Sequence, residues 1–243
     1  MPLPKLSTPF YELKIPSTGE KVRYRPFLVR EEKILLTALE SESTEAILDA
    51  MCEVVRSCTE DKVDPTKYPL FDVQYIFLHL RLRSVGETVE LNLPCTHEGC
   101  GGSIIYNLDL EKIKVDVPSE ESRKFEVGSG VGVIFRYPSI LEAKKYDTTE
   151  HTSSTLFSLM ADCIETIYDE TEVYQAKDHT HEELLEFLES ISAKQLKNII
   201  DMFENVPVLR HELSFTCPKC KKKVKYTLEG MEDFFEYASF MKP

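Results

Sequence analysis

Two short cysteine motifs have the residue types and spacing best suited to chemistry in this sequence. Cys217 and Cys220 form a C-x2-C motif, and Cys95 and Cys100 form a C-x4-C motif. Zn²⁺ in structural sites takes four thiolate or imidazole ligands in a tetrahedron, so each motif supplies half of a site. We therefore expect Cys95, Cys100, Cys217 and Cys220 to share one zinc ion, with His97 as an alternative to one of the thiolates.

The expected site is structural, because four protein ligands leave no open position for the water or substrate that zinc catalysis needs. Four ordinary reduced thiols on two hairpin turns are the alternative. The other cysteines, Cys52, Cys58 and Cys163, lie on or beside apolar helix faces, where free cysteine is usually a small buried hydrophobe. The sequence has no G-x-S-x-G or H-E-x-x-H motif, so we expect no enzyme activity and no catalytic residue.

Each cysteine motif stands between two stretches in which apolar and polar residues alternate. This alternation predicts a β-hairpin with the motif at its turn. When Cys100 is aligned with Cys220, Tyr106 falls on Tyr226 and Leu108 falls on Leu228 without a gap. We infer that one hairpin has been duplicated.

The order of the other predicted elements also recurs. A hairpin over 11–24 precedes helices over 29–39 and 44–57, and a hairpin over 125–135 precedes a charged helix start and an apolar helical stripe from Leu156 to Ile167. Arg25-Pro26 closes the first hairpin, and Arg136-Tyr137-Pro138 closes the second. Further helices are predicted after the candidate caps Asp72, Thr180 and Ser192.

These patterns predict an α+β fold made of two diverged repeats related by a pseudo-twofold axis. The first repeat is residues 1–117, with the first cysteine motif. The second is residues 118–243, with the second motif and an aromatic C-terminal helix. The alternative is a coincidental order of common elements.

Three other candidate sites favour a structural interpretation. His79 lies on an apolar stripe, as a core histidine does. His179 and His181 stand at a helix start among acidic residues, which indicates a solvated cap. The glycine-rich run 128–132 lacks the G-K-[ST] ending of a phosphate loop and lies between predicted strands.

Composition narrows the class of protein. The chain has 243 residues and no apolar run long enough for a membrane span, which predicts a soluble, unexported protein. The odd count of seven cysteines predicts reduced thiols. The net charge of −13 argues against a general nucleic-acid binder. One local exception is the group that we call the lysine tip: Lys219, Lys221, Lys222, Lys223 and Lys225. It is either a solvated hairpin end or a surface for an anionic partner.

The two ends of the chain have compositions suited to docking. Residues 1–9 contain Pro2, Pro4 and Pro9, which predict an extended arm, and residues 232–241 form an aromatic helical pattern. Strand addition and helix-in-groove binding use such segments. The alternative is that both ends fold back on the body of the protein.

The sequence resembles the T4-type bacteriophage baseplate proteins, a family described as baseplate hub assembly proteins or catalysts. The resemblance rests on PLPKLSTPFYELKIPSTGEKVRYRPFLVREEKILL, YPLFDVQYIFLHLRLRSVGE, PCTHEGC and CPKC. It implies a non-enzymatic assembly factor for the hub of a contractile-tail baseplate, which binds other baseplate or hub subunits in the host cytoplasm. Retention in the virion baseplate is left open. The alternative function is a zinc-ribbon-like nucleic-acid-binding module that uses the lysine tip.

Overall fold

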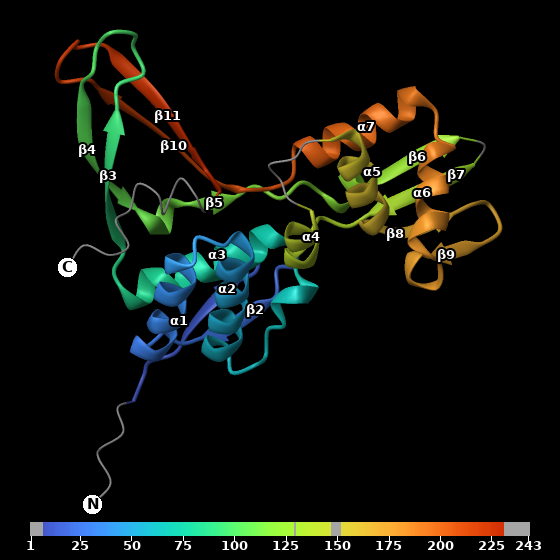
Figure 1. Cartoon of the computed structure of the whole chain (residues 1–243), viewed down its shortest axis with the longest axis horizontal. Coiled ribbons are helices and arrows are strands. Elements are labelled where there is room, and N and C mark those ends of the chain that lie inside the picture. The colour runs from blue at the N-terminus through green and yellow to red at the C-terminus, as the bar shows by residue number, and fades with distance from the viewer. Residues whose placement is uncertain (1–6, 129, 147–151, 231–243) are drawn as a thin grey trace, which may run out of the picture. The chain divides into compact units, whose positions relative to one another are not determined.

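The computed structural model of the chain describes residues 7–128, 130–146 and 152–230 (Figure 1). These residues form α-helices and small antiparallel sheets, which confirms the predicted α+β class. Backbone contacts divide the chain into two compact units. Unit 1 holds Met1–Asp64, Phe71–Asp116 and Val208–Pro243, and unit 2 holds Pro65–Leu70 and Val117–Pro207. Within the described ranges, no helix is long and apolar enough to cross a membrane.

The helical part of unit 1 follows an N-terminal hairpin. Its elements are β1 (Tyr11–Lys14), β2 (Lys21–Tyr24), α1 (Val29–Glu40), α2 (Thr44–Cys58) and α3 (Leu70–Ser84). α2 begins where the sequence predicts, because the Ser43 side chain accepts a hydrogen bond from the Ala46 N–H and caps the helix. α1 starts at Val29, also as predicted.

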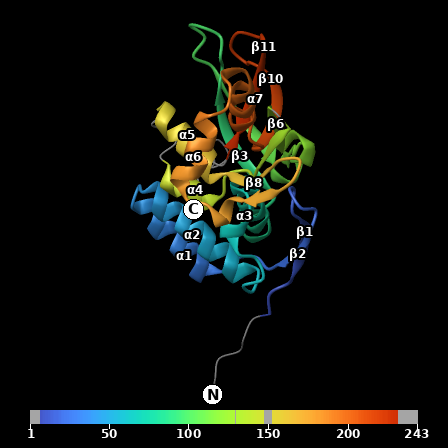
Figure 2. The same ribbon diagram turned by 90° about the vertical axis from the view of Figure 1, so that its right-hand side faces the viewer.

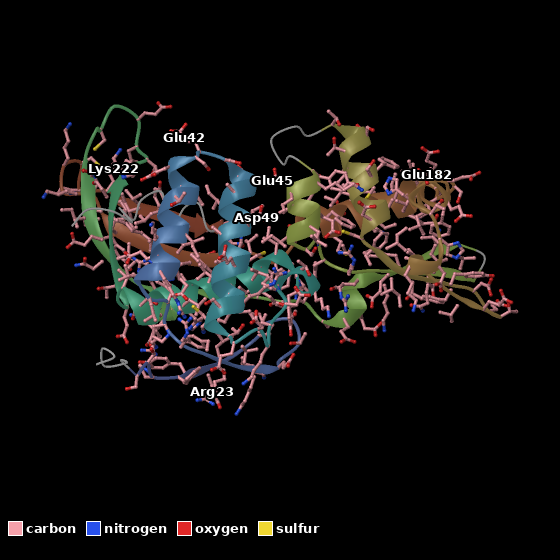
Figure 3. All side chains as sticks on the ribbon, turned by 60° about the horizontal axis from the view of Figure 1, so that its bottom comes forward. Arg23, Glu42, Glu45, Asp49, Glu182 and Lys222 are labelled. Atoms are coloured by element: carbon pink, nitrogen blue, oxygen red, sulfur yellow. The ribbon has the colours of Figure 1, made fainter. Side chains whose placement is uncertain are left out.

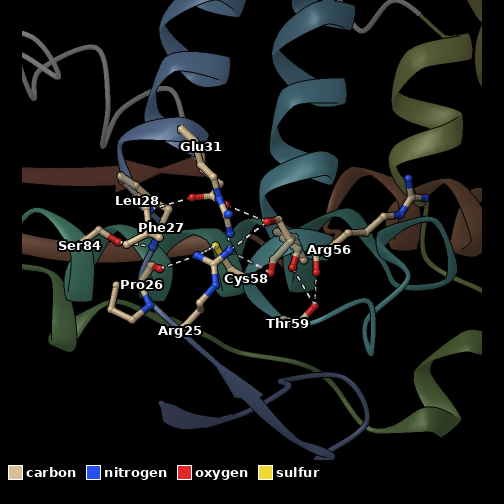
Figure 4. A network of polar contacts seen from close by, with 12 residues as sticks. Arg25, Pro26, Phe27, Leu28, Glu31, Arg56, Cys58, Thr59 and Ser84 are labelled. Atoms are coloured by element: carbon tan, nitrogen blue, oxygen red, sulfur yellow. Dashed lines mark hydrogen bonds and ion pairs between the residues drawn. The ribbon is translucent and has the colours of Figure 1, made fainter. Parts of the chain in front are cut away.

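α3 is the centre of this part of unit 1. It runs between the α1–α2 pair and the β1–β2 hairpin (Figure 4), and it is buried on several sides. A helix that is apolar around most of its circumference needs this kind of central position. Asp72 is not the cap of α3 that the sequence suggested. It is a fully buried residue inside the helix, and its carboxylate accepts hydrogen bonds from the Ser17 N–H and hydroxyl in the β1–β2 turn.

The rest of unit 1 is two β-hairpins that lie side by side (Figures 1 and 2). Their strands are β3 (Thr88–Pro94) with β4 (Ser103–Asp109), and β10 (Leu209–Thr216) with β11 (Lys223–Glu229). β5 (Lys114–Val115) pairs with the first residues of β10. Alternate residues of each hairpin are buried, including Leu91, Leu93, Phe215 and Val224. A single hairpin is marginal in water, so burial of these faces stabilises the pair.

Unit 2 is a four-stranded antiparallel sheet with helices. The strand order is β6-β7-β8-β9, formed by β6 (Lys124–Gly128), β7 (Val131–Phe135), β8 (Ile164–Tyr168) and β9 (Val173–Gln175). Its helices are α4 (Ile140–Lys145), α5 (Ser153–Asp162), α6 (His181–Glu189) and α7 (Ala193–Glu204). Side chains from β7, α5, α6 and α7 share one apolar core around Phe135, Met160, Leu188 and Ile199. Short 3-10 turns connect elements in both units: η1 (Pro65–Lys67), η2 (Leu110–Lys112), η3 (Glu120–Arg123) and η4 (Ala176–Asp178).

The predicted helical stripe from Leu156 to Ile167 is wrong in its second half. α5 ends at Asp162, and Ile164–Tyr168 is strand β8, in which Ile167 pairs with Val133 of β7. Apolar residues at Ile164 and Ile167 fit a helical period as well as a strand that is buried by a neighbour. Gly128 ends β6 and Val131 begins β7, so the glycine-rich run connects two strands, as predicted, and does not precede a helix.

The compact units and the predicted repeats divide the chain differently. The unit boundary at Asp116 and Val117 lies beside the expected repeat junction, but the second cysteine hairpin belongs to unit 1. A sequence repeat need not be a compact unit, so the division into residues 1–117 and 118–243 stays a proposal. The proline-rich residues 1–6 and the aromatic residues 231–243 lie outside the described residues.

Candidate metal centre

The turns of the two side-by-side hairpins bring the four motif cysteines together. Their sulfur atoms all lie within 4.8 Å of one another, although the motifs are more than 100 residues apart in the chain. Cys100 and Cys217 are buried, while Cys95 and Cys220 are partly exposed. In the described part of the chain, this is the one group of three or more His, Cys, Asp or Glu side chains with the spacing of a metal site.

Two of the six distances between these sulfurs match those of tetrahedral coordination, and the other four are below 4.8 Å. Cys95 Sγ lies 3.8 Å from Cys220 Sγ, and Cys100 Sγ lies 3.7 Å from Cys217 Sγ. Four sulfurs at about 2.3 Å from a central Zn²⁺ would be about 3.8 Å apart, whereas a disulfide needs about 2.0 Å. His97 is close as well, with its Nδ1 atom 3.3 Å from Cys95 Sγ. The donor set therefore suits one soft divalent ion such as Zn²⁺.

The backbone of the two cysteine turns is built alike. The Cys95 N–H donates to the Gly102 carbonyl at 2.7 Å, and the Cys217 N–H donates to the Lys222 carbonyl at 2.9 Å. The residue after the second cysteine has left-handed backbone in both turns, with φ of 55° at Gly101 and 60° at Lys221. The strand registers agree too, since Leu91 pairs with Tyr106 and Leu213 pairs with Tyr226. Two similar turns thus present their cysteines to each other.

Gly102 allows the two turns to approach closely. A Cβ atom at this position would lie 3.0 Å from Cys217 Sγ and 3.0 Å from Lys219 Cβ, closer than ordinary van der Waals contact. The second turn has Lys222 at the equivalent position, with an exposed side chain. Only one of the two turns therefore needs a glycine here.

Hydrogen bonding favours a thiolate at one of the four cysteines. The backbone N–H groups of Cys220 and Lys219 donate to Cys217 and lower its pKa to about 6. The His97 N–H also donates to Cys95 and favours its thiolate, but burial and the hydrogen bonds shared with the other three sulfurs outweigh it and raise the pKa of Cys95 to about 12. A divalent cation among the sulfurs would favour the thiolate form of all four.

The lysine tip surrounds the second cysteine turn. All five of its lysines are exposed, three in the turn and two on the outward side of β11. In the described ranges, no carboxylate forms an ion pair with any of them. The cysteine cluster therefore lies next to a group of exposed lysines that form no ion pair in the described ranges.

A second polar cluster, which the sequence did not single out as a site, lies at the end of the β1–β2 hairpin (Figure 4). The buried Arg25 guanidinium donates to Glu31 Oε1 at 2.8 Å and to the Ser57 carbonyl at 3.3 Å. The Arg25 N–H donates to the Cys58 carbonyl at 2.9 Å. Burial alone would raise the pKa of Glu31, but hydrogen bonds from Arg25, Arg30 and Leu28 outweigh it and lower the pKa to about 2.

Unit 2 contains a cluster of the same design. Arg136 donates to both carboxylate oxygens of Glu142, at 3.1 and 2.8 Å, and to the Asp162 carbonyl at 2.7 Å. The Arg136 N–H donates to the Cys163 carbonyl at 2.9 Å. Burial again opposes ionisation, but Arg136 and Ser139 lower the pKa of Glu142 to about 2. An arginine followed six residues later by a glutamate is the sequence signal that could have revealed both clusters.

The remaining sequence candidates have structural surroundings. Burial lowers the pKa of His79 to about 4, and its ring packs edge-on against Tyr75. His181 contacts the Asp162 carboxylate through Nδ1 at 2.7 Å at the start of α6. Burial raises the pKa of the Cys58 and Cys163 thiols to about 12, which leaves them protonated and unreactive at neutral pH.

Comparison with known proteins gives two matches. The model of the family described as T4 bacteriophage base plate protein matches residues 8–236. The baseplate hub assembly protein gp26 of Enterobacteria phage T4 is 26% identical over 227 residues, which cover 93% of this chain and 98% of that protein. No solved structure matches the chain.

Proposed function

Because this chain belongs to the T4 bacteriophage base plate protein family, we propose that it is a non-enzymatic hub assembly protein that binds other baseplate subunits. The observation that carries this proposal is the similarity to gp26, which extends over nearly the whole length of both chains. A protein that promotes assembly without catalysis acts by binding one conformation or arrangement of its partners more tightly than others. We place this action in the cytoplasm of the infected host cell, where new baseplates are built. The phage is expected to have a contractile tail.

Co-purification tests the proposed assembly function. The chain is expressed together with the other hub subunits of its own phage, and a tag on this chain is used to isolate complexes. We expect at least one hub subunit to co-elute in a defined ratio. Elution of the folded chain without any hub subunit, in every combination, would contradict the function.

The second part of the proposal is one structural zinc ion bound by Cys95, Cys100, Cys217 and Cys220. The sulfur separations of 3.7 and 3.8 Å support it, because they match the edges of a zinc–thiolate tetrahedron. The ion would join two hairpins whose cysteine motifs are far apart in the chain, and structural zinc sites of this kind contribute directly to folding. Its chemistry would be limited to holding the sulfurs, since the chain supplies all four ligands.

Metal analysis of the reduced protein tests the zinc site. We expect about one zinc ion per chain, and we expect Cys217→Ser to lower both the zinc content and the melting temperature. Cys52→Ser is the matched control, because Cys52 is a buried cysteine of α2 outside the cluster and should leave the zinc content unchanged. Less than about a tenth of an equivalent in the wild type would exclude the ion as a resident ligand.

We also propose that the chain is a duplicated α+β repeat, with residues 1–117 and 118–243 as the two copies. The matching cysteine turns and the matching Arg25 and Arg136 clusters support this proposal. In an experimental structure, residues 10–110 should superpose on residues 123–229 at the hairpins, at α2 and α5, and at the paired cysteines. Failure of the two Arg–Glu clusters to coincide in that superposition would argue for a coincidental order of elements.

A zinc-ribbon-like nucleic-acid-binding module is the alternative function, and the lysine tip is the observation that favours it. Binding through phosphate contacts weakens steeply as salt concentration rises. Tight, salt-sensitive binding to DNA or RNA, lost when the tip lysines are changed, would favour this alternative over the assembly function.

A further inference from the structure

The lysine tip is a dense group of positive charges supported by two paired hairpins. Its five lysines are exposed within seven residues, on a chain with 42 acidic and 29 basic side chains. Like charges at such spacing repel one another, and no carboxylate in the described part of the chain forms an ion pair with them. Because the tip stands on paired hairpins, it can present these charges without first becoming ordered.

Unit 1 also carries a compact acidic surface made of three carboxylates. Glu40 ends α1, Glu42 lies in the following turn, and Glu45 lies in the first turn of α2. All three side chains are exposed, and no lysine or arginine in the described ranges forms an ion pair with them. We call these three residues the acidic turn.

The two surfaces do not neutralise each other within one chain. Figure 3 shows Lys222 on its hairpin, whereas Glu42 and Glu45 lie in and beside the turn that joins α1 to α2, which is a separate part of unit 1. No ion pair joins the lysine tip to the acidic turn in the structure as described. Each surface therefore retains its charge for contact with another molecule.

We propose that the lysine tip binds the acidic turn of a second copy of this chain. The contact is heterologous, because it joins two different surfaces, so repetition gives a ring or an open chain of copies. A long nucleic acid is a poorer occupant, because the acidic remainder of the chain repels an extended polyanion while a compact acidic turn meets the tip alone. Exposed ion pairs are individually weak, so association should be reversible and sensitive to salt.

Sedimentation velocity of the full-length, zinc-loaded protein tests the contact at about 50 mM and about 500 mM NaCl. We expect concentration-dependent association at the lower salt concentration and monomers at the higher one. Lys222→Glu, Lys223→Glu and Lys225→Glu together should weaken the association at least tenfold, as should Glu40→Lys, Glu42→Lys and Glu45→Lys together. Lysine-to-arginine changes at the same three positions keep the charge and should preserve association.

A mixture of the two charge-reversed variants gives the decisive result. Each variant alone brings like charges together and should remain monomeric, but the mixture pairs opposite charges again and should associate. Circular dichroism of each variant shows whether it has folded, and this measurement is independent of both the contact and the proposed zinc site. Monomers at low salt in the wild type, or no association in the mixture of folded variants, would overturn the proposal. Binding of a duplex DNA probe to the wild type without self-association would also overturn it and would assign the tip to nucleic acid.

Discussion

The Arg25 cluster of unit 1 and the Arg136 cluster of unit 2 use the same contacts in different surroundings. In each, an arginine at the end of a hairpin binds a glutamate in the first turn of the next helix and a carbonyl near the end of a second helix. The side chain of Arg25 is 10% exposed, whereas that of Arg136 is 38% exposed. The exposed fraction of the arginine decides how much free energy of unfolding is lost when its glutamate is removed. A charge that loses its partner can be solvated only where water reaches it.

Glu31→Ala should have the largest effect. The change leaves the Arg25 guanidinium buried without its carboxylate, and breaking a buried pair in this way costs about 3–5 kcal/mol. Urea unfolding should measure the loss in free energy of unfolding. Hydrogen exchange should show reduced amide protection in unit 1. Glu32→Ala is the matched control, since Glu32 is the exposed neighbour in the same helix turn. Equal stability of the two variants would show that the Arg25 cluster is not a stabilising element.

Acid should weaken both clusters. The pKa values of Glu31 and Glu142 are about 2 in the folded chain, below the value of about 4.5 expected when unfolded, so the unfolded chain binds protons first as pH falls. The stabilisation is complete above about pH 4.5 and is lost as the pH falls toward 2. It is about 3 kcal/mol for Glu31 and smaller for Glu142, because its partner Arg136 is partly exposed.

Urea unfolding over this pH range would measure the acid effect. The stability difference between wild type and Glu31→Ala should narrow as the pH falls toward 2. A constant difference for Glu31→Ala down to pH 2 would mean that its ionised carboxylate contributes nothing.

Glu142→Ala should have a smaller effect than Glu31→Ala, about 2 kcal/mol, which is typical of lost hydrogen bonds to a charged group. The Arg136 head is partly exposed, so water can replace the missing carboxylate. Hydrogen exchange of the variant and the wild type should differ only in unit 2, where amide protection falls. Glu186→Ala on α6, where the side chain is exposed, is the control. A loss as large as that of Glu31→Ala would refute the role assigned to exposure.

The smallest difference in stability between the two clusters should come from the residues that precede α1 and α4. Ser139 caps α4, because its hydroxyl accepts from the Leu141 N–H at 3.1 Å, and Ser139→Ala should cost about 1 kcal/mol. Leu28 occupies the same place before α1, offers no side-chain cap and is 41% exposed. Leu28→Ala should therefore change the unfolding midpoint less than Ser139→Ala, and the reverse order would contradict the capping argument.

The sequence by itself determined the local elements. Periodic apolar residues and capping residues located α1, α2, α6 and α7, and alternation around the cysteine motifs located the paired strands, because these features depend on neighbours a few residues away. The likeness of the two cysteine turns was also readable, since Tyr106 and Tyr226 fall at the same distance from their cysteines.

The tertiary structure decided what depends on distant residues. Ile164 and Ile167 form a strand because β7 pairs with them, and Asp72 is buried because the Ser17 turn covers it. The need for glycine at 102 appears only when the other cysteine turn is in place. Burial of Arg25, and the partial exposure of Arg136, likewise come from packing that no local pattern encodes. Contacts between residues far apart in sequence depend on the whole chain's packing, and a single sequence carries no direct record of them.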